Sequence, residues 1–146
     1  MAEANNTIKS QIRRNAVALI SLIVAVSSLS YNTWRNEETE DNRNQRLASF
    51  EVLLKLNELQ QLVFHRHYDK DLLDKGNPRT GWAYVLTIRD LSRVLHPPLP
   101  AAADKLLTVW NENWSDLAEK QANLDLVIAE IDNVRAETLL LLESLE

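Results

Sequence analysis

Hydrophobic and polar residues divide the chain into one stretch without charge, one stretch without any apolar residue, and a longer region with helical periodicity. The charge-free stretch covers residues 15–34. At about 1.5 Å per residue, a helix of this length spans about 30 Å, the thickness of the hydrocarbon core of a bilayer. Arg13 and Arg14 precede the stretch, and Tyr31 and Trp34 near its other end suit the headgroup region. The pattern predicts a single transmembrane helix.

The residues around the predicted span indicate its orientation. The tail at residues 1–14 is basic, and basic segments tend to stay in the cytoplasm. We therefore expect a cytoplasmic N-terminus and an extracytoplasmic helical domain, which is periplasmic if the cell is bacterial. Arg35, Arg43 and Arg46 follow the span and weaken the charge difference behind this expectation.

A cleaved secretory signal is the alternative interpretation of the same segment. Ser28 and Ser30 would provide the small residues that signal cleavage needs. The charge-free stretch is long for the apolar region of a signal, so we favour a retained anchor. Cleavage would instead release a soluble exported domain.

Small side chains recur within the span at spacings of three and four residues, which places them on one helical face. Another helix can approach such a face closely. The predicted membrane contact face consists of Ala18, Ser21, Ala25 and Ser28.

After the span, residues 35–46 contain no apolar side chain and are predicted to form a polar stalk. Leu47 begins an apolar helix that we expect to end near Leu72 and Leu73. At about 100° per residue its apolar positions form two sectors. One sector holds Val52, Leu56, Leu59 and Val63, and the other holds Leu47, Phe50, Leu53, Leu54 and Phe64. Two sectors predict that this helix packs on more than one neighbour.

The remaining helices are bounded by caps and prolines. Asn77-Pro78 or Thr80 suits the start of a helix, and the proline-rich segment 96–100 suits its end. Pro100 then opens a region with a three-four apolar repeat that reaches Leu145 and is typical of a coiled coil.

A break near residues 111–113, with Asn113 or Ser115 as the cap, would allow the last helix, 115–146, to return antiparallel along the first. The predicted fold class is therefore all-α. A transmembrane helix and a stalk precede an antiparallel three- or four-helix bundle at residues 47–146, and we favour four helices.

Composition and charge limit the function classes. Two glycines and four prolines in 146 residues fit a helical protein, and the absence of cysteine excludes disulfides and thiolate ligands. The formal net charge is −5, and the bundle is more acidic than the whole chain because the tail is basic. An acidic surface repels phosphate backbones, so we expect no nucleic-acid partner.

Residue types that carry chemistry do not combine into a recognisable site. His65 and His67 are two residues apart and point to different sides of a helix, so they cannot share a metal ion. Asp69, Asp71 and Asp74 lack the spacing of a calcium loop. With no phosphate loop or nucleophile motif, we predict no catalytic residues, no metal and no cofactor, and we expect the protein not to be an enzyme.

Two other groups of residues are candidates for binding. Aromatic and basic side chains that could line a ligand pocket at the outer end of the bundle are Trp82, Trp110, Trp114, Arg79 and Arg89. Tryptophans at this spacing are more often core residues. A run of four leucines faces every direction of a helix, so a monomeric bundle cannot cover all of them. This predicted partner surface is Leu139, Leu140, Leu141 and Leu142.

These features favour a single-pass membrane protein whose helical bundle acts through protein–protein contacts, as an accessory subunit or a homo-oligomer. Its expected partners are the lipid bilayer and either a membrane protein or a second copy. In architecture alone, a span followed by an acidic bundle resembles the extracytoplasmic sensing modules of bacterial receptors. The alternative hypothesis is therefore a sensor-like bundle that binds a small ligand.

Overall fold

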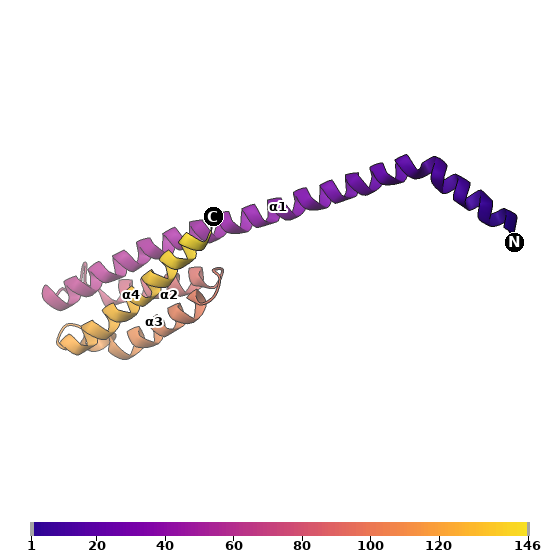
Figure 1. The fold of residues 1–146 in the computed structure, drawn as a ribbon. Helices are drawn as coiled ribbons and strands as arrows, with labels where there is room; N and C mark the ends of the chain where they lie inside the picture. The colour runs from indigo at the N-terminus through magenta and orange to yellow at the C-terminus, as the bar shows by residue number, and fades with distance from the viewer. Residues whose placement is uncertain (1, 146) are drawn as a thin grey trace. The chain divides into compact units, whose positions relative to one another are not determined.

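The computed structural model describes the backbone of residues 2–145 and the side chains of residues 10, 11 and 13–145. This part of the chain is helical and contains no strand (Figure 1). Its elements are α1 (Ala2–Tyr68), α2 (Pro78–Ser92), α3 (Leu99–Asn113), the short 3-10 helix η1 (Trp114–Asp116) and α4 (Gln121–Ser144). The prediction of an all-α protein with four α-helices is confirmed.

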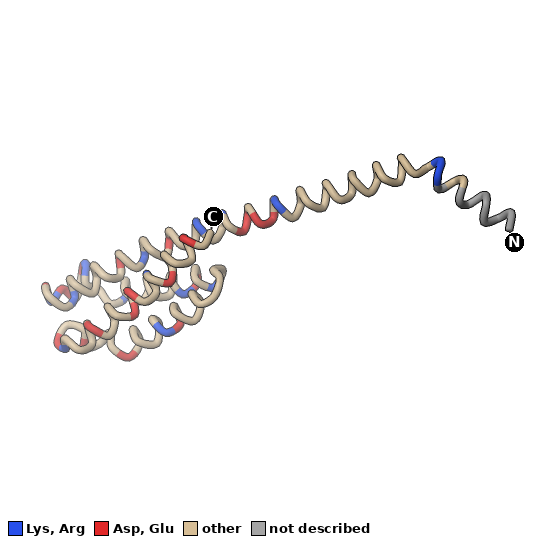
Figure 2. Tube along the Cα trace, in the orientation of Figure 1, with Lys and Arg blue, Asp and Glu red and all other residues tan. Residues whose placement is uncertain are grey.

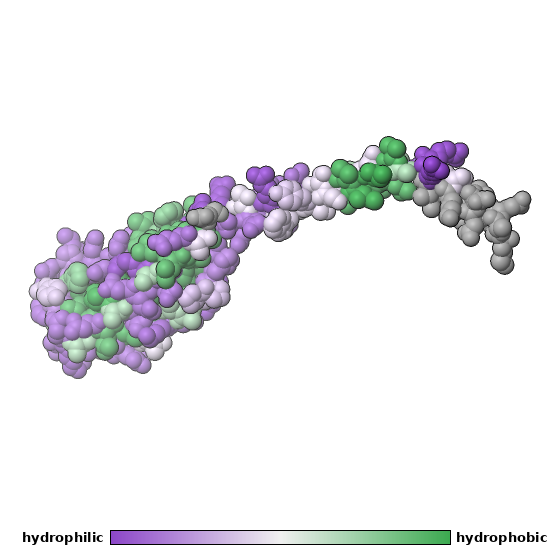
Figure 3. Space-filling model, in the orientation of Figure 1, coloured by the Kyte–Doolittle hydropathy of each residue, from purple (hydrophilic) through white to green (hydrophobic). Residues whose placement is uncertain are grey.

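The chain divides into two compact units, residues 1–41 and residues 42–146. The first unit contains the N-terminal part of α1, and every side chain at residues 17–41 is exposed. Figure 2 shows that basic residues bound a charge-free stretch there. Figure 3 shows that the part of this stretch nearer the N-terminus is hydrophobic and that the rest is of intermediate hydropathy. α1 is long and apolar enough to cross a membrane. Most side chains of the predicted basic tail, 1–14, lie outside the described residues.

The second unit has one hydrophobic core, to which all four α-helices contribute. The predicted α1 stripe of Val52, Leu56, Leu59 and Val63 is fully buried in it, which confirms that sector as a core face. The other helices provide Val85 and Ile88 from α2, Leu99, Ala103, Leu106 and Trp110 from α3, and Leu124, Val127, Ile131 and Val134 from α4.

The second apolar sector of α1 is mostly exposed. α1 does contact more than one neighbour, since Gln45 donates to the carbonyl oxygen of Val94 and Arg135 of α4 donates to Gln60. These neighbours cover the first sector and its edges. Of the second sector only Leu53 packs against the core, whereas Phe50 and Leu54 stay more than half exposed. The prediction that this helix packs on more than one neighbour is therefore confirmed, although most of the second sector stays exposed in the part of the chain that the structure describes.

The helix that follows the stalk ends earlier than predicted, at Tyr68 instead of Leu72 or Leu73. Lys70 adopts a positive φ of 54°, and the chain then turns into a loop before α2. Asn77 caps α2, and its side-chain oxygen accepts the N–H of Arg79 at 3.0 Å. The predicted start at Asn77-Pro78 is therefore correct.

The break in the last apolar repeat falls at Asn113, the C-terminal residue of α3, within the predicted segment 111–113. The predicted caps are wrong, because the Asn113 side chain donates to the carbonyl oxygen of Val109 and α4 has no side-chain cap. α4 begins at Gln121, six residues after the predicted start at Ser115. The intervening turn is stabilised by burial of Leu117, which is 1% exposed.

Gly81 allows α2 to approach α3 closely. A Cβ atom at this position would lie 2.4 Å from two atoms of the Trp110 indole ring. Such a distance is far below van der Waals contact, and Trp110 is fully buried and cannot move away without disturbing the core.

We expect Gly81→Ala to lower the free energy of unfolding. The overpacking cost of about 1–3 kcal/mol exceeds the helix-propensity gain of about 1 kcal/mol from alanine. Trp110→Phe removes the ring atoms in question, so the same glycine substitution should be tolerated, or even stabilising, in that background. Denaturant unfolding of the four proteins of this double-mutant cycle measures the coupling. Additive effects of the two substitutions would contradict the proposed clash.

Candidate interaction surface

The three tryptophans proposed to line a pocket do come together. The Trp82 ring lies edge-to-face against Trp110 and Trp114, with ring centroids 6.4 Å and 6.5 Å apart. Trp110 is fully buried in the core, and Trp82 and Trp114 pack against it. The rings therefore fill space around one another, as core aromatics do.

The two arginines of that predicted pocket make contacts of a different kind from those of the tryptophans. Arg89 donates to the carboxylate of neighbouring Asp90 at 2.8 Å. Arg79 is exposed in the first turn of α2, where its backbone N–H is capped by Asn77. None of the five predicted residues lines either of the two clefts described next, so this ligand pocket stays a prediction.

A polar cleft of about 460 Å³ lies between the C-terminal half of α1, the loop after it and α2. It is lined by Glu58, Gln61, Leu62, His65, Asp74, Lys75, Thr80 and Tyr84. The cleft carries side chains of both charges. The sequence offers no signal for it, because its residues come from two helices and a loop whose packing brings them together.

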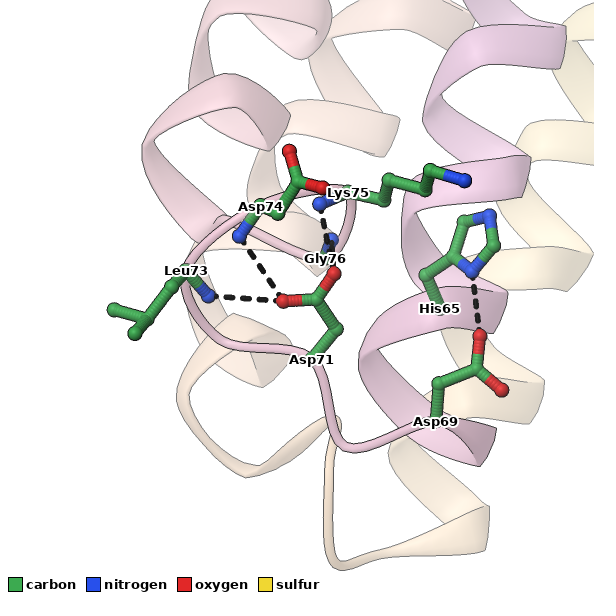
Figure 4. Close-up of polar contacts among 7 residues, drawn as sticks. All are labelled: His65, Asp69, Asp71, Leu73, Asp74, Lys75 and Gly76. Atoms are coloured by element: carbon green, nitrogen blue, oxygen red, sulfur yellow. Dashed lines mark hydrogen bonds and ion pairs between the residues drawn. The ribbon is translucent and has the colours of Figure 1, made fainter.

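The two histidines near the end of α1 have separate partners. His65 lies 2.5 Å from the carboxylate of Asp69, whereas buried His67 donates from Nδ1 to the carbonyl oxygen of Leu117 at 2.6 Å (Figure 4 draws the His65 pair). The two rings thus point to different neighbours, as the helix geometry predicts. Among the described residues, no group of three or more histidine, aspartate or glutamate side chains is placed to hold a metal ion.

The Asp71 carboxylate organises the loop between α1 and α2 (Figure 4). Its Oδ1 accepts the N–H groups of Leu73 and Asp74, both at 3.0 Å, and its Oδ2 accepts those of Lys75 at 2.8 Å and Gly76 at 3.4 Å. These backbone donors, those of Asp74 and Leu73 most strongly, hold the pKa of Asp71 below its ordinary value. The carboxylate is a structural cap.

The four consecutive leucines near the end of α4 differ in exposure. Leu139 and Leu140 are 45% and 58% exposed, whereas Leu141 packs against the core and Leu142 is partly buried. A shallow cleft of about 200 Å³ lies beside them. It is lined by Pro97, Pro98, Glu137, Leu140, Leu141 and Ser144.

Two further surfaces consist of exposed side chains, small ones in the first unit and apolar ones in the second. In the first unit, the predicted contact face of Ala18, Ser21, Ala25 and Ser28 is exposed along its whole length. In the second unit, α1 exposes Leu47, Phe50, Leu54, Phe64 and Tyr68. The sequence pattern placed all of this second group except Tyr68 in one apolar sector of the helix, and predicted only that the helix packs on more than one neighbour.

Comparison of the chain with protein-family models, with curated proteins and with solved structures finds no match. Any conclusion about function therefore depends on the chain's own geometry.

The pKa shift of Asp71 predicts how the loop responds to pH. The folded-state pKa lies below the unfolded value of about 3.9, so this group stabilises the fold above that pH and the contribution is lost as pH falls through the folded-state pKa. We expect Asp71→Ala to lower the melting temperature at pH 7, and the difference from the unmodified protein to shrink at acidic pH. Asp74→Ala, which changes an exposed carboxylate of the same loop, is the control. A difference that is equal at both pH values would contradict the assignment.

Proposed function

We propose that this protein is a single-pass membrane protein whose helical domain acts through protein–protein contacts, as an accessory subunit or a homo-oligomer. The observation that carries the proposal is the charge-free helix at residues 15–34, whose apolar side chains are almost all exposed, in a chain that also contains a domain with its own core. Exposed apolar area costs about 25 cal/mol per Å² in water. Insertion into a bilayer removes that cost for the whole stretch.

The proposed topology places the N-terminus in the cytoplasm and residues 42–146 outside it. Arg13 and Arg14 directly precede the span and support this orientation through the positive-inside rule. Tyr31 and Trp34 are exposed near the other end of the span, where amphipathic rings suit the interface.

The proposed arrangement of the helical domain is an antiparallel, coiled-coil-like four-helix bundle. Its support is the single core shared by α1, α2, α3 and α4 and the hydrogen bonds that join distant segments. Gln45 bonds to Val94 and His96 at one end of the domain, and His67 bonds to Leu117 at the other.

A contact function, as opposed to catalysis, is supported by the apolar side chains that this domain leaves exposed at Leu139 and Leu140. Large apolar patches on a soluble surface are typical of interaction sites. A second candidate, binding of a small ligand, is supported by the polar cleft of about 460 Å³ at His65.

Membrane anchoring predicts that the full-length chain sediments with membranes and resists extraction at alkaline pH. We expect Val24→Arg to release much of the protein, since an arginine at the centre of a span costs about 2.5–3.5 kcal/mol. Leu73→Arg, at a loop position that is 89% exposed, is the matched control and should leave membrane association unchanged. Recovery of a shortened soluble chain that begins after Ser30 would overturn the anchor and favour the exported, ligand-binding alternative.

The contact function predicts a companion in the purified complex. We expect Leu140→Glu to reduce the yield of a co-purifying chain about tenfold in mild detergent, because a charge in an apolar interface costs more than about 1.4 kcal/mol. Native mass spectrometry of the solubilised protein measures this yield. Leu73→Glu serves as the control, and an unchanged complex in Leu140→Glu would exclude the end of α4 from the interface.

A further inference from the structure

The exposed face of α1 in residues 42–146 has a regular pattern. Its positions alternate at spacings of three and four residues, and none of them is charged. We name this face the outer seam, and it consists of Leu47, Phe50, Leu54, Asn57, Gln61, Phe64 and Tyr68. The five apolar or aromatic members are 38–63% exposed.

The outer seam lies opposite the face of α1 that packs into the domain core. With Leu47 at the a position and Phe50 at the d position of a heptad, the a and d positions form the outer seam. The f position lies farthest from it and is occupied by Val52, Leu59 and Arg66. Val52 and Leu59 are fully buried in the core. α1 therefore has two opposite apolar faces, and α2, α3 and α4 occupy only one of them.

Contacts from the neighbouring helices lie along the edges of the outer seam and reach one of its members, Asn57. Arg135 of α4 donates to Gln60 Oε1 at 2.6 Å and to Asn57 Oδ1 at 3.3 Å. On the other flank, Lys55 lies 5.4 Å from the centroid of the Tyr84 ring of α2 and pairs with Glu58 at 2.7 Å. Between these flanks Leu54 is 55% exposed, so a further helix has access.

The polar members of the outer seam indicate which helix fits. Asn57 and Gln61 carry amides, which both donate and accept hydrogen bonds, so each can pair with the same residue of an identical helix. A polar residue at a seam position is known to fix the register and the number of helices in a coiled coil. An identical helix in register places Asn57 beside Asn57 and Gln61 beside Gln61.

The charges beside the seam are complementary in the same arrangement. Arg46 and Glu51 are exposed and lie five residues apart. Arg46 occupies a g position and Glu51 the next e position, and these two heptad positions flank the seam. In a parallel in-register pair, such positions meet across the interface. Arg46 of each copy then lies beside Glu51 of the other, which gives two symmetric opposite-charge contacts. Glu58, at the next flanking position, is already paired with Lys55 of its own chain.

We propose that two copies of this chain associate as a parallel, in-register coiled-coil dimer through the outer seam of α1. The proposal rests on the proposed membrane anchor, because two copies inserted with the same orientation both begin their outer seams on the same side of the membrane. The partner surface is separate from the leucines at the end of α4. The Asn57 and Gln61 layers select an identical helix over an unrelated apolar one.

The absence of cysteine from the chain makes the test direct. Phe50→Cys and Phe64→Cys are prepared as separate single-cysteine full-length proteins, and membranes containing each are oxidised mildly. We expect each variant to form a disulfide-linked dimer by itself, because a parallel register places each position beside its own copy. Leu126→Cys, at a position of α4 that is 53% exposed, is the matched control and should remain monomeric.

Two further variants test the chemistry of the interface. Leu54→Glu should abolish cross-linking through Phe50→Cys while leaving the melting temperature of the domain nearly unchanged, since Leu54 does not belong to the core. Arg46→Glu should lower the cross-linked fraction several-fold, and the swap Arg46→Glu with Glu51→Arg should restore it.

The outcomes separate the dimer from the anchor. Monomers at both cysteine positions, in protein that still sediments with membranes, would overturn the dimer and leave the anchor intact. Cross-linking only when the Phe50→Cys and Phe64→Cys proteins are mixed would overturn the parallel register. Cross-linking to a different protein would overturn self-association. Protein found in the soluble fraction would instead overturn the anchor, and with it the reason for a parallel arrangement.

Discussion

The burial of one stripe of α1 against three shorter helices is the interaction on which the structure of residues 42–146 depends. Val52, Leu56, Leu59 and Val63 are fully buried, and each of the other helices directs its own apolar stripe to the same core. Burial of such side chains contributes about 1.5–3 kcal/mol each. Because every other helix packs its apolar stripe on this one side, the apolar side chains on the opposite side of α1 stay exposed in the described part of the chain.

Polar contacts set the ends of the elements around that core. Gln45 bonds to two backbone groups near the end of α2, and buried His67 bonds to the carbonyl oxygen of Leu117. Asp71 satisfies four backbone N–H groups of the first loop. These side chains pair backbone groups of the segments between the helices, and a backbone group of that kind is costly when it is buried and unpaired. Residues that look like candidate ligands in the sequence thus have structural roles here.

The exposed apolar surfaces of the chain indicate where it contacts other molecules. The helix at residues 15–34 exposes apolar side chains, and so do the outer seam and Leu139 and Leu140. A chain that left all of them in water would lose solubility. The helix at residues 15–34 suits a bilayer because it is uncharged along its whole length. The outer seam suits a second helix of the same sequence because its polar layers are self-complementary.

The sequence by itself determined the helical class, the membrane-length apolar stretch, a helix start at Asn77-Pro78 or Thr80 and a break near residues 111–113, because these depend on local composition and on the helical period. Only the tertiary structure decided which apolar sector of α1 faces the core, since two sectors of similar hydrophobicity compete and the choice depends on where distant helices pack. It likewise decided that the tryptophans pack against one another and that the cleft at His65 exists. Those outcomes depend on contacts between residues far apart in the chain, which periodicity does not encode.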